Sequence, residues 1–260
     1  MSGTRLHSST EGNCLLLTID SADHRHALTP EVCAAGIEAL NVAESNPEVR
    51  CVVITGAGPA FSAGEQLPGL LASRQGPTEA GAVGVDALHS WIETIRAFPK
   101  PVIAAVSGVC SGTGLSLALA CDFVVAARDS AFSLSQSAHG LSPTGGLTWA
   151  FARSLPRATV MQWLMAGDKI SATRLLELGV VNALCEPGQV LSQSLSIAEH
   201  LQRRAGHALA SIKELVNDAQ ETSLHQQLAA ERSHFVRNLH HPETGARLAA
   251  LSQPPLQASR

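Results

Sequence analysis

The sequence predicts an α/β protein, because short apolar strand-like runs alternate with helical patterns along the chain. The runs CLLLTI at 14–19 and CVVIT at 51–55 are rich in β-branched residues and predict buried strands. Between them, residues 30–45 form a helical pattern in which Thr29 can cap the first turn and Pro30 occupies it. This order is typical of a strand, a crossover helix and a neighbouring strand.

The middle of the chain repeats this signal. Residues 102–106 and 123–126 are buried-strand runs, and residues 114–121 between them are apolar on every side, as in a helix enclosed in a core. Residues 101–121 contain no charge, but the Ser, Thr and Gly cluster within them favours strand, turn and buried helix over a transmembrane span. Further on, Ser171 can cap a short helix before a last strand.

Domain organisation follows from length and pattern. A chain of 260 residues can bury one substantial core with an appendage. We expect an α/β core over 1–190 and a helical region over 191–260, which is suited to packing on another subunit. Residues 68–84 are rich in Gly, Ala and Pro and predict a mobile flap over a pocket, before an amphipathic helix at 85–98.

Composition excludes several classes of partner. The net charge of −4 and the absence of a Lys or Arg run argue against nucleic acid or an anionic membrane as a partner. The six cysteines form no CxxC pair and lie mostly in apolar runs, which predicts core residues of a reducing compartment and no metal site. The N-terminal residues lack the apolar stretch of a secretory signal, so a cytoplasmic location is expected.

The most informative segment is the glycine turn SGTG at 111–114, which joins a buried strand to a helix. The first N–H groups of a helix have no intrahelical acceptor, so Thr113 can direct its N–H at an anion. The turn is not followed by the phosphate-binding lysine of a P-loop, and it lacks the third glycine of a dinucleotide-binding motif. Neither nucleotide-binding motif is therefore present. The run GLSLA at 114–118 resembles a serine nucleophile elbow but lacks its last glycine and lies inside the helix.

Several motifs occur together in order along nearly the whole chain. They are LTIDSADHRHALTPEV, VRCVVITGAGPAFSAGEQL, KPVIAAVSGVCSGTGLSLALACDFVVAA, FSLSQSAHGLSPTGGLTW and MAGDKISATRLLELGVVNAL. In these motifs the chain resembles the crotonase superfamily, the enoyl-CoA hydratase/isomerase family. The resemblance implies a spiral of ββα turns with a C-terminal helical region that trimerises, giving a homotrimer or a dimer of trimers.

The resemblance also implies an activity. Members bind acyl-CoA thioesters and stabilise an enolate with two backbone N–H groups, here those of Glu65 and Thr113. Coenzyme A enters as part of the substrate, and no separate cofactor is expected. The same motifs imply substrate contacts at these positions: Ala63, Gly64, Leu67, Gly112, Ser116, Gln136, Leu141 and Thr144.

Three positions depart from the family pattern. Ser116 and Gln136 stand where hydratases carry two glutamates, and neither side chain exchanges a proton unaided near neutral pH. Thr144 stands where a group of isomerases has a proton-shuttling aspartate, and where dehalogenases have an aspartate nucleophile. Ordinary hydration is therefore not expected from this chain.

Few titratable residues remain as acid or base. His89 lies where some relatives place a catalytic histidine, although a half-exposed helix histidine is an equal alternative. Glu65 can be a general base if its side chain points into the pocket, and its turn position favours a solvated side chain instead. His139 is expected to be structural. For coenzyme A, the resemblance points to Arg25 and Ala27 in the run RHAL.

The sequence thus predicts an isomerase-like or decarboxylase-like enzyme acting on an acyl-CoA. Decarboxylation generates an enolate without a base that removes a proton from carbon, so an oxyanion hole suffices. The alternative is a catalytically degenerate protein that binds CoA thioesters, which the missing carboxylates favour.

Overall fold

The computed structural model describes residues 3–252, with the exception of His24, Gln66 and Asp168. By its contacts the chain divides into two compact units, Met1–Leu201 and Gln202–Arg260. The elements of the first unit are β1 (Arg5–Glu11), β2 (Cys14–Asp20), α1 (Pro30–Ser45), β3 (Cys51–Gly56), α2 (Leu67–Gln75), α3 (Thr78–Ala97), β4 (Val102–Val106), β5 (Val109–Ser111), α4 (Thr113–Ala120), β6 (Phe123–Ala127), β7 (Ala131–Ser133), the 3₁₀ turn η1 (Ser137–His139), α5 (Leu147–Ser154), α6 (Arg157–Ala166), β8 (Lys169–Ser171), α7 (Ala172–Glu177), β9 (Ala183–Cys185) and α8 (Val190–Gln202).

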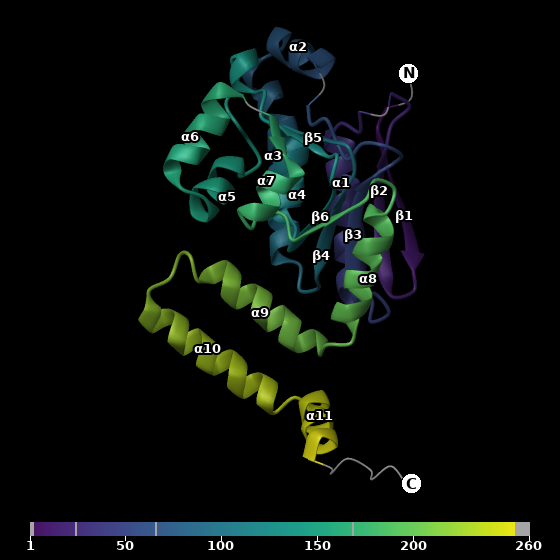
Figure 1. Ribbon diagram of the computed structural model, residues 1–260, viewed down its shortest axis with the longest axis vertical. Coiled ribbons are helices and arrows are strands. Elements are labelled where there is room, and N and C mark those ends of the chain that lie inside the picture. The colour runs from purple at the N-terminus through teal and green to yellow at the C-terminus, as the bar shows by residue number, and fades with distance from the viewer. Residues whose placement is uncertain (1–2, 24, 66, 168, 253–260) are drawn as a thin grey trace. The chain divides into compact units, whose positions relative to one another are not determined.

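Two sheets form the framework of the first unit (Figure 1). Among the described residues, the larger sheet has the strand order β1-β2-β3-β4-β6-β9, in which β1 is antiparallel to β2 and the other pairs are parallel. Parallel neighbours need crossover connections, and α1, α3 and α4 lie in these connections. The smaller sheet has the order β5-β7-β8. The predicted α/β class is confirmed.

The two faces of the larger sheet are buried in separate clusters. Alternate residues of β2 point to opposite faces: Leu17 joins the cluster of α1, α3 and α4, whereas Leu16 joins the cluster that includes Val190 and Ala198 of α8. Helices therefore cover both faces, as a parallel sheet requires. The helix at 30–45 has its predicted bounds, and the Thr29 side chain accepts a hydrogen bond from the Val32 N–H.

The segment predicted as a flap differs from the expectation. Residues 68–84 are largely helical, because α2 begins at Leu67 and α3 begins at Thr78, seven residues before the predicted helix at 85–98. Alanine and leucine, the best helix formers, separate the glycines here and allow helix on both sides of Pro77. The strand β1 was not predicted, because its side chains are mostly exposed and polar.

The cysteines are core residues. None of the six forms a disulfide within the described residues; Cys121 is half-buried and the others are buried. Burial raises the pKa of the Cys33 thiol to about 12. Burial likewise raises the pKa of the Cys110 thiol. These thiols therefore remain protonated and unreactive at neutral pH.

The second unit contains α9 (Gly206–Asp218), α10 (Leu224–Leu239) and α11 (Pro242–Ser252). Ser223 and Gln226 form a capping box at the start of α10. In the part of the chain that the structure describes, no helix is long and apolar enough to cross a membrane.

Candidate active site

Two glycine-containing turns from distant parts of the sequence lie against each other. Ser62 forms a parallel bridge with Cys110, and the Ser111 N–H donates to the Ser62 carbonyl oxygen at 2.9 Å. The chain thus passes from β5 through Gly112 into α4 directly beside the turn at 62–65. Gly112 has φ 53° and ψ −123°, a backbone conformation that glycine adopts without strain.

Gly64 makes the closest approach between the two turns. Its φ is +82°, and a Cβ at this position would lie 2.6 Å from the Ser111 carbonyl oxygen and 2.9 Å from the Thr113 nitrogen. Any larger residue would separate the turns. The absence of a side chain at Gly64 therefore holds the Gly64–Glu65 peptide beside the start of α4.

The N–H groups of Glu65 and Thr113 find no acceptor among the residues that the structure describes. Neither donates a hydrogen bond to an acceptor in the described residues, whereas the Gly64 N–H donates to Ser62 Oγ and the Gly112 N–H donates to the Ser133 carbonyl. Thr113 is the first residue of α4, where the helix dipole adds partial positive charge. Two donors in adjoining turns are thus available to an anionic or strongly polarised oxygen.

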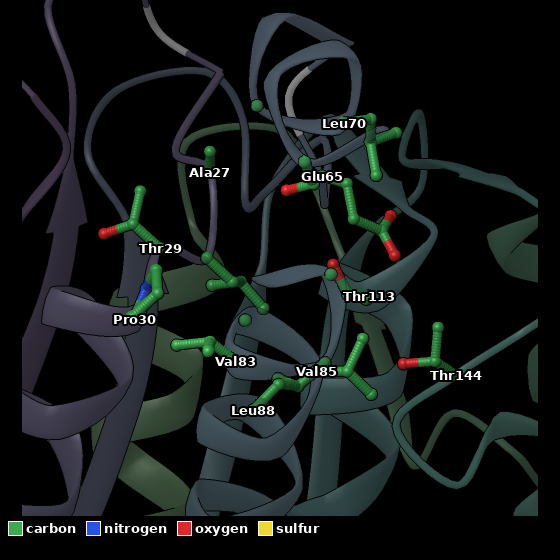
Figure 2. Close-up of a pocket in the computed structure, with 15 residues that line it drawn as sticks. Ala27, Thr29, Pro30, Glu65, Leu70, Val83, Val85, Leu88, Thr113 and Thr144 are labelled. Atoms are coloured by element: carbon green, nitrogen blue, oxygen red, sulfur yellow. The ribbon is translucent and has the colours of Figure 1, made fainter. Parts of the chain in front are cut away.

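A cavity of about 270 Å³ lies in front of these turns. Figure 2 shows its wall, which comes from the segment after β2, from both turns, and from α2 and α3. Apolar side chains dominate it, as in most small-molecule sites. The lining residues are Ala27, Leu28, Thr29, Pro30, Glu65, Gly69, Leu70, Ser73, Gly81, Val83, Gly84, Val85, Leu88, Thr113 and Thr144.

The Glu65 side chain points into the site, in contrast to the expected solvated orientation. Its Oε2 lies 2.9 Å from the position that a Cβ on Gly112 would occupy, so the carboxylate lies over the second turn. In Figure 2 the carboxylate is between Leu70 and Thr113. Glu65 is also the one ionisable residue among the described residues that line the cavity. The orientation depends on the backbone of Gly64, which the sequence does not reveal.

Three buried polar atoms of the residues around the two turns have no hydrogen-bond partner within the described structure. They are Thr113 Oγ1, Gln136 Nε2 and Thr144 Oγ1. Gln136 Nε2 lies 3.3 Å from the same Cβ position on Gly112 that Glu65 approaches. Buried polar atoms are normally satisfied, so these three atoms are exceptions within the described structure.

Among the residues predicted to contact the substrate or to act as acid or base, Gln136, Ser116, Leu141 and His89 lie outside the cavity wall. Ser116 is buried, and its Oγ donates to the Thr144 carbonyl oxygen at 2.8 Å, which fixes the turn that carries Thr144. Leu141 is exposed. His89 is an exposed residue of α3 whose Nε2 accepts a hydrogen bond from the Gly145 N–H at 3.1 Å. His139 is exposed in η1.

The residues predicted to contact coenzyme A lie along the first turn. The Ala63 N–H donates to the Arg25 carbonyl oxygen at 2.8 Å, so these two segments run side by side. Ala27 is buried and lines the cavity, whereas the Arg25 side chain is exposed. Leu67 begins α2.

Between Arg25 and Ala27, His26 is buried with φ 49°. Its Nε2 lies 2.7 Å from the Ala57 carbonyl oxygen, and its Nδ1 is 3.2 Å from the Ser21 nitrogen. Histidine is among the residues enriched in the left-handed conformation. The His26 ring therefore holds the backbone of this segment and does not face the cavity.

The sequence placed the segment 68–84 over a pocket, and residues of α2 and the start of α3 do line the cavity, but their helical structure was not predicted. Val85 and Leu88 lie in the predicted amphipathic helix, so their apolar spacing was a usable signal. Gly69, Leu70 and Val83 lie in the segment predicted as a flap over a pocket, whose composition did not identify them individually.

A separate cluster in the second unit contains metal-ligand residue types. His207, His241 and Glu243 place potential ligand atoms within 4.8 Å of one another. However, the His207 and His241 rings are stacked at 3.7 Å with an angle of 19° between their planes. Ring nitrogens bind a metal along directions in the ring plane, so nearly parallel stacked rings cannot direct both nitrogens at one ion. Arg247 also pairs with Glu243 at 2.8 Å. The present geometry suits a hydrogen-bonded cluster.

Comparison with known proteins identifies the class. The family model described as enoyl-CoA hydratase/isomerase matches residues 9–248, and the chain belongs to this family. The mixed α/β fold is the crotonase fold, since a crystal structure of an enoyl-CoA hydratase from Polaromonas sp. JS666 superposes with a TM-score of 0.94. That structure is 54% identical, and the match covers 95% of this chain and 96% of the other.

Two relatives with lower identity differ in their reactions. The 1,2-epoxyphenylacetyl-CoA isomerase of Escherichia coli (strain K12) is 31% identical over 228 residues, which cover 87% of each chain. The carnitinyl-CoA dehydratase of Salmonella enteritidis is 30% identical over 256 residues, which cover 98% of this chain and 95% of the relative. The family is thus established, whereas the similarity alone does not select one reaction.

Proposed function

We propose that this protein is an enzyme that acts on an acyl-CoA thioester and stabilises an enolate. The N–H groups of Glu65 and Thr113 hold the thioester oxygen as negative charge develops on it. Their free donors and adjoining turns support this role, as does membership of the family. Preorganised donors favour an oxyanion over a neutral carbonyl, and removal of one such donor typically costs about 3 to 4 kcal/mol of transition-state stabilisation.

Isomerisation is the reaction that this wall favours. The single observation that carries the proposal is the inward carboxylate of Glu65, the one ionisable group among the described lining residues. In a 3-enoyl thioester, this carboxylate takes a proton from the α carbon and returns it to the γ carbon as the double bond moves. The enolate formed between the two steps is held by the N–H pair.

Two other reactions of the family fit less well. A decarboxylase must bind a substrate carboxylate near the enolate, and Glu65 would repel it at that place. For hydration, Ser116 and Gln136 replace the two glutamates, and Ser116 Oγ is already bonded to the Thr144 carbonyl. The similar Polaromonas structure is nevertheless described as an enoyl-CoA hydratase, so both substrates belong in the test.

The test measures enolate formation and product separately. Deuterium incorporation at the α carbon of butyryl-CoA in D₂O, followed by mass spectrometry, reports enolate formation whatever the natural acyl group. Isomerisation of a 3-enoyl-CoA raises the absorbance of the conjugated thioester. Hydration of crotonyl-CoA lowers this absorbance. We expect deuterium exchange and a gain with the 3-enoyl-CoA that exceeds any loss with crotonyl-CoA.

A protein that only binds CoA thioesters gives a different result. Butyryl-CoA would then bind in calorimetry, with neither deuterium exchange nor turnover of either unsaturated thioester. The replacements at Ser116, Gln136 and Thr144 favour this second candidate.

We also propose that the second unit assembles with further copies of the chain, as a trimer or a dimer of trimers. Many large apolar side chains of α9, α10 and α11 are exposed in the single chain, which is typical of a surface covered in an oligomer. Light scattering that gives the mass of one chain would contradict this proposal. The exposed residues are Ile212, Val216, Leu224, Leu228, Phe235, Val236, Leu239, Leu248 and Leu251.

A further inference from the structure

The direction of the Glu65 N–H is set by the peptide bond that carries it. The Gly64–Glu65 peptide is trans, so its carbonyl and its N–H point in opposite directions. The Gly64 carbonyl oxygen accepts a hydrogen bond from the Leu28 N–H at 3.4 Å. The Glu65 N–H therefore points away from Leu28, and it keeps this direction as long as the turn at 62–65 stays against the segment at 25–28.

Hydrogen bonds of two kinds hold the turn at 62–65 against this segment. Backbone N–H and carbonyl groups form two of them, at 2.8 Å and 3.4 Å. A side chain forms another, because Ser62 Oγ donates to the His26 carbonyl oxygen at 2.7 Å. The same Oγ accepts from the Gly64 N–H at 3.1 Å. The Ser62 hydroxyl thus links the turn to the segment, and a substitution can remove this link without changing the backbone bonds.

The acceptor of this hydroxyl is itself held in place. His26 is buried, and its N–H donates to Ser21 Oγ at 2.9 Å. Its Nε2 lies 2.7 Å from the Ala57 carbonyl oxygen, so Nε2 carries the ring proton and Nδ1 accepts from the Ser21 N–H at 3.2 Å. These bonds fix the ring and the backbone of His26, and with them the carbonyl oxygen that receives the Ser62 hydroxyl.

Ser62 also contacts the second turn. A Cβ on Gly114 would lie 2.7 Å from the Ser62 carbonyl oxygen and 2.8 Å from the Ser62 Cβ. Gly114 follows Thr113 in the first turn of α4, so Ser62 packs directly against the segment that carries the second donor. Ser62 is buried and is not among the residues that line the cavity. It can therefore act on a substrate only through the turns.

We propose that Ser62 is a positioning residue, whose hydroxyl holds the first turn so that the N–H groups of Glu65 and Thr113 meet one oxygen. This inference rests on the proposed function, because it assumes that these two groups bind the thioester oxygen. Without the hydroxyl, the turn moves relative to the segment at 25–28 and to α4. A displacement of about 1 Å at a reacting group can cost about a hundredfold in rate.

The first measurement compares Ser62→Ala with Ser130→Ala in steady-state kinetics and calorimetry. Ser130 is also buried, and its Oγ donates to the Val106 carbonyl oxygen at 3.0 Å. Both variants thus lose a buried hydrogen bond to a backbone carbonyl, and we expect similar decreases in unfolding temperature. In Ser62→Ala, kcat for the better unsaturated thioester should fall about tenfold to a hundredfold, while the dissociation constant of butyryl-CoA changes only a few-fold. Ser130→Ala should keep the kcat of the parent.

The second measurement detects the donors through the bound carbonyl. Hydrogen bonds to a thioester oxygen weaken the C=O bond and lower its stretching frequency, which infrared difference spectra report for butyryl-CoA with ¹³C at the carbonyl. In the parent, the bound band should lie below that of the free thioester. Ser62→Ala should move the band back towards the free position, and Ser130→Ala should not. Ser62→Cys keeps a weaker donor of similar size, so it should change kcat and the band in the same direction by less. It also provides the test if Ser62→Ala does not fold.

Each outcome has a distinct meaning. If the Ser62 variants keep the kcat and the carbonyl band of the parent, the positioning role is overturned and the proposed function stands. If Ser130→Ala lowers kcat and moves the band as much as Ser62→Ala does, a general loss of stability explains the effect, and the positioning role is again overturned. If butyryl-CoA does not bind to the parent, or binds with its band at the free position, the proposed function fails as well.

Discussion

The two glycine turns and the polar side chains beside them build the site by different means. The turns at 62–65 and 111–114 offer backbone N–H groups, whose positions depend on Gly64 and Gly112. The neighbouring wall offers side chains, of which the carboxylate of Glu65 and the hydroxyl of Thr144 are polar. Most substitutions leave a backbone N–H in place. A substitution of an acid–base or substrate-binding side chain removes its function. A chain can thus keep the two glycine turns while it exchanges the side chains beside them.

The largest effect is expected from a substitution in the glycine turns. In Gly64→Ala, the new Cβ would meet the Ser111 carbonyl at 2.6 Å and the Thr113 nitrogen at 2.9 Å, so the two turns must separate. Because this displaces both N–H donors, we expect kcat to fall by about 10² to 10³ or more, as when an oxyanion donor is lost. Steady-state kinetics with the better substrate of the enoyl-CoA assay measures the change.

Gly188→Ala is the matched control for this prediction. Gly188 has the same φ of +82°, but a Cβ there meets nothing within 4 Å. Both variants carry the backbone strain of a left-handed alanine, about 1 to 2 kcal/mol of unfolding free energy. If Gly188→Ala lost activity to the same extent as Gly64→Ala, backbone strain and not the contact between the turns would explain the lost activity. The special role of the glycine turns would then be contradicted.

The sequence predicted the two glycine turns better than the orientation of the side chains beside them. The strands β2, β3, β4 and β6 and the helix α4 follow from apolar runs, since burial on both faces leaves a strong hydrophobic signal. The motifs placed Glu65 and Thr113 in the turns. The orientation of the Glu65 side chain was not predictable, because it depends on a left-handed glycine and on the opposite turn. The helix α2 was missed because local glycine and proline content outweighed its short leucine and alanine pattern.

The second prediction concerns the Glu65 side chain beside the turns. Glu65→Gln keeps the N–H and the size of the side chain but removes the group that carries a proton. We expect kcat for isomerisation to fall by about 10² to 10⁴, the usual contribution of a general acid–base group, while the dissociation constant of butyryl-CoA changes only a few-fold. Kinetics and calorimetry on the same sample separate the two effects. Glu79→Gln, at an exposed position of α3, should retain the activity of the parent.

His89 provides the contrast that sharpens this prediction. Its Nε2 accepts a hydrogen bond from the Gly145 N–H, so the ring holds the turn next to Thr144, and His89 is not among the residues that line the cavity. His89→Ala should therefore lower kcat less than tenfold, because the lost hydrogen bond loosens a turn without removing the proton carrier. Should His89→Ala abolish turnover while Glu65→Gln leaves it intact, the acid–base role would belong to α3, and the Glu65 carboxylate would serve only to bind the acyl group.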